Sequence, residues 1–216
     1  MKKIIKYLFL LTGGSFILAS CNDFLDREPL DSVTPDNFFF TENDLAAYAV
    51  KHYNFTTHEG FNAGIWKNDN ATDNQAATDY DKKWIPGQWK VPEAYDNPAS
   101  NDPWYFSTIR EANYFLETVV PRFEKGEIEG SETNIKHYIG EMYFLRAKNY
   151  LSKLETFGDF PIIKNTLPDE SESLIQASKR APRYKVAHFI LEDLDQAISL
   201  LTNNISGGKN RITKNA

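Results

Sequence analysis

Four segments of the chain carry apolar residues at the three- and four-residue spacing that places them on one face of an α-helix. The first begins after Thr41, and Asp44 three residues later makes a weaker version of a capping box. Its predicted face consists of Leu45, Tyr48, Ala49, His52 and Tyr53. In the second, we expect Asp102 as the N-cap, Pro103 at the first helical position and Pro121 at the end. Its predicted face consists of Tyr105, Ile109, Ala112, Leu116, Val119 and Val120.

The third segment predicts a helix that Ser131 caps, that runs to about Thr156 and that Gly158 closes. It carries apolar residues on two sides, so we expect it to lie between two neighbouring helices. One side consists of Ile135, Tyr138, Ile139, Met142 and Arg146, and the other of Phe144, Ala147, Leu151 and Leu154.

The fourth helix follows Pro182, after a turn at residues 157–161 and a predicted polar loop at residues 166–178. Its face consists of Val186, Ile190, Leu194, Ala197 and Leu201. Thr213 could cap a further helix, for which no residues follow. We therefore expect a chain truncated at its C-terminus, whose fourth helix lacks a packing partner. The alternative is that this face packs back on the third helix.

These segments predict an all-α protein built from successive antiparallel helix pairs, as in a tetratricopeptide-like superhelix. Residues 56–101 show no sustained period and predict a long irregular, aromatic-rich loop, a length that indicates either a functional surface or elements that the pattern does not reveal. They contain Gly60, Gly64, Pro86, Gly87, Pro92 and Pro98 together with Trp66, Trp84 and Trp89. The predicted plan is a signal peptide at 1–20, an extended leader at 21–40 and an incomplete helical domain at 41–216.

The N-terminus has the order of a secretory signal, with three lysines before residue 7 and no charged side chain from there to Ser20. This stretch is shorter than the roughly 20 apolar residues that span a bilayer. Leu18, Ala19, Ser20 and Cys21 look like a bacterial lipobox, in which the thiol is acylated and the chain is cut before the cysteine. We expect Cys21 to be lipidated; the alternative is a cysteine that follows an ordinary cleaved signal by chance.

Removal of the signal would change the net charge from −6 to −9, with 21 basic and 30 acidic residues. This balance argues against nucleic acid as a partner, because phosphate binding needs clustered Lys and Arg. A single cysteine excludes an intrachain disulfide framework and a Cys-rich metal site. The histidines lack the short spacings of a zinc site, and no phosphate loop or nucleophile elbow occurs, so we predict no metal, cofactor or catalytic residue.

Six short motifs occur along the chain: CNDFLD at 21–26 with Pro29 after it, IREAN at 109–113, GEMYFLRA at 140–147, FGDFP at 157–161, EDLDQA at 192–197 and RITKNA at 211–216. Together and in this order they resemble the SusD/RagB family of outer-membrane lipoproteins. The resemblance implies a tetratricopeptide-like scaffold, a glycan or other nutrient bound without cleavage, and a SusC-like TonB-dependent transporter as partner. The sequence departs from the family by stopping where the family continues.

Five polar residues lie on or beside the helix faces: Arg110, Asn113, Glu141, Arg146 and Asp193. Catalytic roles are one interpretation. We instead expect them to pair across helix contacts, since an unpaired buried polar group costs about 1 to 3 kcal/mol. Glycoside hydrolysis would need two carboxylates about 5 to 10 Å apart across a cleft, and no motif singles out such a pair.

Aromatic and polar residues alternate in the irregular segment, which the resemblance makes part of the binding surface. A sugar ring has an apolar face and a hydroxyl rim, which flat aromatics beside Asn and Asp complement. The predicted ligand-binding residues are Trp66, Asp69, Asp73, Asn74, Tyr80, Trp84 and Trp89. Trp84 and Trp89 could instead fill the space between loop and helices. We predict a surface-exposed, non-catalytic glycan-binding lipoprotein; a peptide ligand, a glycan-active enzyme and a purely structural role remain alternatives.

Overall fold

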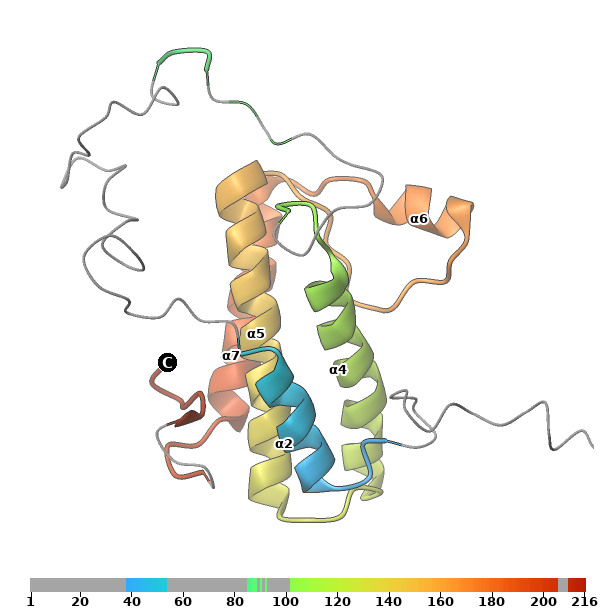
Figure 1. The fold of residues 1–216 in the computed structure, drawn as a ribbon, viewed down its shortest axis with the longest axis vertical. Helices are drawn as coiled ribbons and strands as arrows, with labels where there is room; N and C mark the ends of the chain where they lie inside the picture. The colour runs from blue at the N-terminus through green and yellow to red at the C-terminus, as the bar shows by residue number, and fades with distance from the viewer. Residues whose placement is uncertain (1–37, 54–84, 89, 91, 93–101, 206–209) are drawn as a thin grey trace, which may run out of the picture. The chain divides into compact units, whose positions relative to one another are not determined.

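The computed structural model describes residues 38–53, 85–88, 90, 92, 102–205 and 210–216 (Figure 1). These residues form helices and no extended strand, which confirms the all-α prediction. The helices are α2 (Glu42–Lys51), α4 (Ser107–Lys125), α5 (Glu132–Phe157), α6 (Ser171–Ala177) and α7 (Arg183–Leu200). The long helix α5 is central, and α2, α4 and α7 each pack against it. None of the helices in the described ranges is long and apolar enough to cross a membrane.

Helix α2 begins with the predicted capping box. The Asp44 amide donates to Thr41 Oγ1 at 3.3 Å, and the Thr41 amide donates to Asp44 Oδ2 at 2.9 Å. Such caps contribute about 1 kcal/mol because they satisfy amides that have no partner within the helix. Leu45, Tyr48 and Ala49 are buried, as the predicted face requires.

Helix α5 is capped from α2. Ser131 occupies the N-cap position, as predicted, but its side chain makes no capping hydrogen bond. Instead, Glu42 Oε2 accepts hydrogen bonds from the Ser131 amide at 2.7 Å and from Asn134 Nδ2 at 3.2 Å. The preceding Gly130 has φ of +133°, and a Cβ atom there would lie 2.7 Å from Cβ and Cγ of Glu42. The contact between α2 and the start of α5 therefore depends on glycine.

Both predicted ends of α4 are wrong. The helix begins at Ser107, because Asp102 Oδ1 accepts from the Trp104 amide at 2.8 Å and so stabilises a separate turn before it. The helix also continues through Pro121 to Lys125. A proline inside a helix removes one backbone hydrogen bond and costs about 3 kcal/mol. Burial of the α4 face that includes Phe115 and Val119 outweighs this local preference.

The two-sided burial of α5 is confirmed, but Phe144, predicted on the side of Ala147, packs against the cluster of the other side, and Leu151 also departs from the prediction. Ile135, Tyr138, Ile139 and Met142 are buried, and the core cluster that contains them also draws residues from α2 and α4. On the other side the predicted Leu151 is 45% exposed. Tyr150 is fully buried instead, in a second cluster with Ala147, Phe160 and Phe189. Tyr150 and Leu151 are adjacent in the helix and point about 100° apart, so the two cannot both face this cluster.

Helix α7 has a packing partner, so the expectation of an uncovered face is wrong. Val186, Ile190 and Leu201 are buried, and α7 packs along α5, which was the alternative prediction. Close approach is possible because Gly140 lies at the contact, where a Cβ atom would be 3.1 Å from side-chain atoms of Leu200 and Leu201. The segment predicted as a polar loop contains the short helix α6, which has no buried residue.

Candidate functional site

The residues predicted to bind ligand lie outside the described ranges, so their roles stay predictions. They are Trp66, Asp69, Asp73, Asn74, Tyr80, Trp84 and Trp89. Cys21 and the predicted signal and leader up to residue 37 lie outside these ranges as well.

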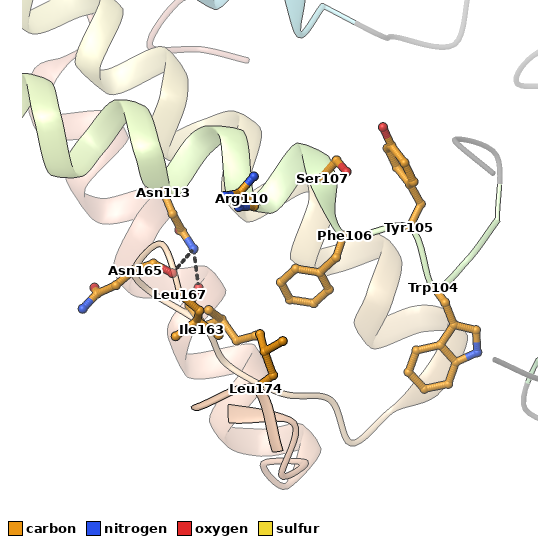
Figure 2. A pocket seen from close by; sticks show the side chains of 10 residues that line it. All are labelled: Trp104, Tyr105, Phe106, Ser107, Arg110, Asn113, Ile163, Asn165, Leu167 and Leu174. Atoms are coloured by element: carbon orange, nitrogen blue, oxygen red, sulfur yellow. Dashed lines mark hydrogen bonds between the residues drawn. The ribbon is translucent and has the colours of Figure 1, made fainter. Parts of the chain in front are cut away.

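Within the described part of the chain, a hollow of about 400 Å³ lies between the start of α4 and the segment that leads into α6 (Figure 2). This volume falls in the range of small-molecule sites, about 300 to 1,000 Å³. Trp104 and Phe106 contribute one wall, and Ile163, Leu167 and Leu174 contribute apolar surface opposite them. Ser107, Arg110, Asn113 and Asn165 add polar groups.

The aromatic wall is supported from behind. The Phe106 ring stacks on Phe160 with 5.7 Å between centroids and 16° between planes. The Trp104 ring lies 4.3 Å from Phe157, and its Nε1 donates to the Pro92 carbonyl at 2.8 Å. The wall is therefore held from several sides before any ligand arrives.

A buried lysine fixes the turn that carries this wall. Lys153 Nζ donates to the carbonyl of Pro103 and, at 3.0 Å, to that of Tyr105. Burial lowers the pKa of Lys153, while the Asp102 carboxylate opposes that shift. An ammonium group that stabilises two carbonyls from within the fold has a positioning role, not that of an exposed ligand contact.

The opposite wall, at residues 163–166, is held by hydrogen bonds from side chains of α4 and α5. Asn113 Nδ2 donates to the carbonyls of Ile163 at 2.9 Å and Asn165 at 3.3 Å. The Tyr150 hydroxyl accepts from the Ile163 amide at 2.9 Å and lies 3.2 Å from its carbonyl, and burial raises the pKa of Tyr150 to about 12. Glu117 Oε2 accepts from both the amide and the hydroxyl of Thr166, at 2.7 and 2.6 Å. The segment is thus ordered through both its backbone and its side chains.

A buried ion pair joins α5 to α7 behind this wall. Arg146 Nε and Nη2 donate to the two carboxylate oxygens of Asp193 at 2.8 and 2.7 Å. Arg146 Nη1 also donates to Asn113 Oδ1 at 2.9 Å. Burial raises the pKa of Asp193, and the Arg146 guanidinium opposes that rise. The prediction that Asn113, Arg146 and Asp193 pair across helix contacts is confirmed.

A second buried network holds the segment 210–216. Arg211 Nε and Nη2 donate to the carboxylate of Glu141 at 2.9 and 2.5 Å, and the guanidinium lies 4.7 Å from the Tyr138 ring centre. The Thr202 amide donates to His137 Nδ1 at 3.1 Å, so His137 Nε2 carries the proton that it donates to Glu141 at 3.0 Å. Glu141 therefore also has the predicted structural role.

Arg110 is the exception among the five predicted pairing residues. It is exposed on the first turns of α4, and no hydrogen bond or ion pair of its side chain is found among the described residues. The sequence pattern could not separate it from Asn113, because the two lie three residues apart on the same helix.

The chemistry available in the hollow is that of binding. It offers aromatic and aliphatic surface, the guanidinium of Arg110, the hydroxyls of Tyr105 and Ser107 and two side-chain amides, and no carboxylate is among the described side chains that line it. The two carboxylates of a glycosidase are thus absent from the lining as described. Sequence reasoning missed Trp104 and Phe106 as site residues. Their signal was the aromatic run Trp104-Tyr105-Phe106 directly before a helix, which we attributed to that helix's first turn.

Comparison with known proteins finds relatives that are described as SusD-like. The SusD-like family described as "Starch-binding associating with outer membrane" matches residues 23–216. SusD-like protein P38 of Formosa agariphila is 27% identical over 203 residues, which are 92% of this chain and 37% of that protein. SusD-like protein P2 of the same organism is 26% identical over 186 residues, 83% of this chain and 35% of that protein. The chain thus spans little more than a third of these relatives.

Two solved structures from Bacteroides fragilis share the fold. A SusD-like protein superposes with a TM-score of 0.55 and 25% identity, over 87% of this chain and 35% of that one. A SusD-like carbohydrate-binding protein superposes with a TM-score of 0.57 and 17% identity, over 82% of this chain and 35% of that one. The tetratricopeptide-like helical arrangement predicted from the sequence is thereby confirmed.

Proposed function

The chain belongs to the SusD-like family, and from this we propose that it takes part in binding a nutrient glycan at the cell surface without cleaving it. The observation that carries the proposal is the match of residues 23–216 to a family described as starch-binding and associated with the outer membrane. The hollow beside α4 supports it, because aromatic walls with a few polar groups are typical of sites that hold sugars.

We assign the main glycan contacts to the aromatic and polar residues predicted between α2 and α4, led by Trp66, Trp84 and Trp89. Flat rings stack on the apolar face of a pyranose, and neighbouring Asp and Asn side chains accept or donate hydrogen bonds at its hydroxyl rim. An open aromatic surface of this kind should bind a short glycan with a Kd on the order of millimolar to micromolar.

The membrane location and the partner belong to the same proposal. Acyl chains on Cys21 would hold the protein at the outer membrane, since each buried methylene contributes about 0.8 kcal/mol and more than one chain gives stable anchoring. The bound glycan would then pass to a SusC-like TonB-dependent transporter. Anchoring beside such a transporter raises the effective concentration of ligand at its entrance even when each contact is weak.

Affinity electrophoresis of the detergent-extracted full-length protein in gels containing single neutral polysaccharides tests this function. We expect retardation by at least one polysaccharide and no release of reducing ends. Trp84→Ala should weaken retardation, whereas Tyr184→Ala, which removes an exposed aromatic from α7, should leave it unchanged. Release of reducing ends that one carboxylate substitution abolishes would establish an enzyme instead. Binding of peptides in place of every glycan would establish the peptide alternative.

A further inference from the structure

We propose that the hollow at the start of α4 binds a sugar that carries a carboxylate, with the sugar ring against Phe106 and the carboxylate on Arg110. This inference rests on the proposed glycan-binding function and names a ligand class and a subsite within it. The subsite residues Phe106 and Arg110 lie outside residues 66–89, which hold the predicted ligand-binding residues.

The ring position follows from how Phe106 is packed. One face of its ring stacks on Phe160, so only the other face can take a ligand. Across the hollow, Ile163 and Leu174 present aliphatic surface toward it (Figure 2). Leu174 is 43% exposed although it is large and apolar, and its helix α6 buries no residue. A flat ring with C–H groups on its face would cover Leu174 and Phe106 together.

The charge position follows from Arg110. The Arg110 amide donates to the Phe106 carbonyl at 3.0 Å, which places the two residues one helical turn apart on the same side of α4. Three other arginines of the fold have partners: Arg122 donates to the Phe38 carbonyl, Arg146 pairs with Asp193, and Arg211 pairs with Glu141. The Arg110 side chain has no such partner in the described ranges. A guanidinium matches a carboxylate with two parallel, charge-assisted N–H donors, and this pair is stronger than its hydrogen bonds to the neutral hydroxyls of a sugar.

The remaining polar groups favour a sugar over an aliphatic or aromatic acid. Asn113 is already used, because its amide group donates to two carbonyls and its oxygen accepts from Arg146. Ser107 and Asn165 still line the hollow with polar atoms. Hydroxyl groups of a sugar could satisfy them, whereas an apolar acid would remove water from them without replacing its hydrogen bonds.

Titration of the full-length protein with a linear trimer of galacturonic acid tests the inference. The neutral galactose trimer of the same linkage and a sulfated form of it are measured alongside. We expect the uronate trimer to bind more tightly than both, with an affinity that falls as salt is added. Arg110→Gln should weaken uronate binding about three- to tenfold, the low end of a charge-assisted contact because the site is open to solvent. Arg183→Gln, an exposed arginine on α7 outside the hollow, should leave it unchanged.

Several outcomes would overturn the assignment. Equal binding of the uronate and neutral trimers would show that Arg110 does not select charge. Preference for the sulfated trimer would show that the anionic group recognised by the site is a sulfate and not a carboxylate. Uronate binding that Arg110→Gln leaves intact would show that the carboxylate binds at another site. Equal competition by acidic peptides would show that the hollow does not select a sugar. If neutral polysaccharides bind but no uronate does, this inference fails while the proposed function stands; if nothing binds, both fail.

Discussion

Arg146 on α5 and Asp193 on α7 form a buried ion pair through two hydrogen bonds of 2.8 and 2.7 Å. The same guanidinium holds Asn113 of α4, which in turn holds the wall of the hollow. One side chain thus connects three helices and the candidate site. Because the pair is shielded from solvent, each partner depends on the other for compensation of its charge.

Substitution of one partner of this pair should destabilise the fold strongly. We expect Arg146→Met to lower the free energy of unfolding by about 3 to 5 kcal/mol, because it leaves the Asp193 carboxylate buried and unpaired. The double variant Arg146→Met, Asp193→Leu should recover part of that loss. Lys164→Met removes an exposed pair with Glu192 and should cost less than about 1 kcal/mol. Urea unfolding followed by circular dichroism measures all three; a loss below 1 kcal/mol in the first variant would contradict the role of the pair.

Two glycines near the start of α5 give a matched test of the contact between α2 and α5. Gly130→Ala should destabilise by more than about 2 kcal/mol, because φ is +133° and the new Cβ would overlap Cβ and Cγ of Glu42. Gly126→Ala has φ of +70° and no atom within 4 Å of its Cβ, so only the left-handed backbone cost of about 1 to 2 kcal/mol applies. Thermal unfolding should rank Gly130→Ala as the less stable; the reverse order would show that the Glu42 contact is easily relaxed.

His52 should make stability depend on pH in a defined direction. Burial lowers the pKa of His52 below its ordinary value of 6.5, although the Glu111 carboxylate opposes the shift. As pH falls through 6.5, His52 therefore becomes protonated in the unfolded chain before it does in the folded protein, and the free energy of unfolding decreases. This loss is complete once pH has fallen below the folded-state pKa of His52. His52→Phe should keep the ring contact with Tyr48 and remove this dependence.

The measurement for His52 is the free energy of unfolding at several pH values between 7.5 and about 5, where few ordinary carboxylates titrate. The wild-type protein should lose more stability over this range than His52→Phe. Parallel curves for the two proteins would show that His52 has the same pKa in the folded and unfolded states.

Hydrogen exchange should distinguish the helices by burial. We expect α6 to exchange its amides first, since it has no buried residue, and α7 to be protected together with α5, against which it packs. Mass spectrometry of the exchanged protein resolves these segments after proteolysis. Rapid exchange across α7 while α5 stays protected would contradict the packing described above.

The anchor prediction depends on Cys21 alone. Cys21→Ala should abolish acylation and release the protein from the outer membrane or leave it with its signal attached. Membrane fractionation and metabolic labelling with a fatty acid report the two effects. Ser20→Ala keeps a small residue before the cysteine and serves as the control. A Cys21→Ala protein that still fractionates with the outer membrane would refute the lipobox interpretation.

The sequence by itself determined four of the helical segments and most of the residues that they bury. Apolar spacing identified α2, α4, α5 and α7, because helix periodicity is local and its buried face must be apolar in any packing. The Thr41 capping box was predicted correctly for the same reason, since its two hydrogen bonds join residues three apart. The family resemblance was likewise carried by short motifs spread over the chain.

Only the tertiary structure decided where helices end, which partner each one has and which polar side chain is left unpaired among the described residues. Pro121 lies inside α4 because burial of that helix outweighs a local penalty, and α7 is covered because Gly140 admits it close to α5. Asn113 and Arg110 have the same local context, yet one is buried in a hydrogen-bond network and the other is exposed beside the hollow. Burial and pairing depend on segments distant in sequence, such as residues 163–165 and 193. A local sequence pattern does not specify which of these distant segments come into contact.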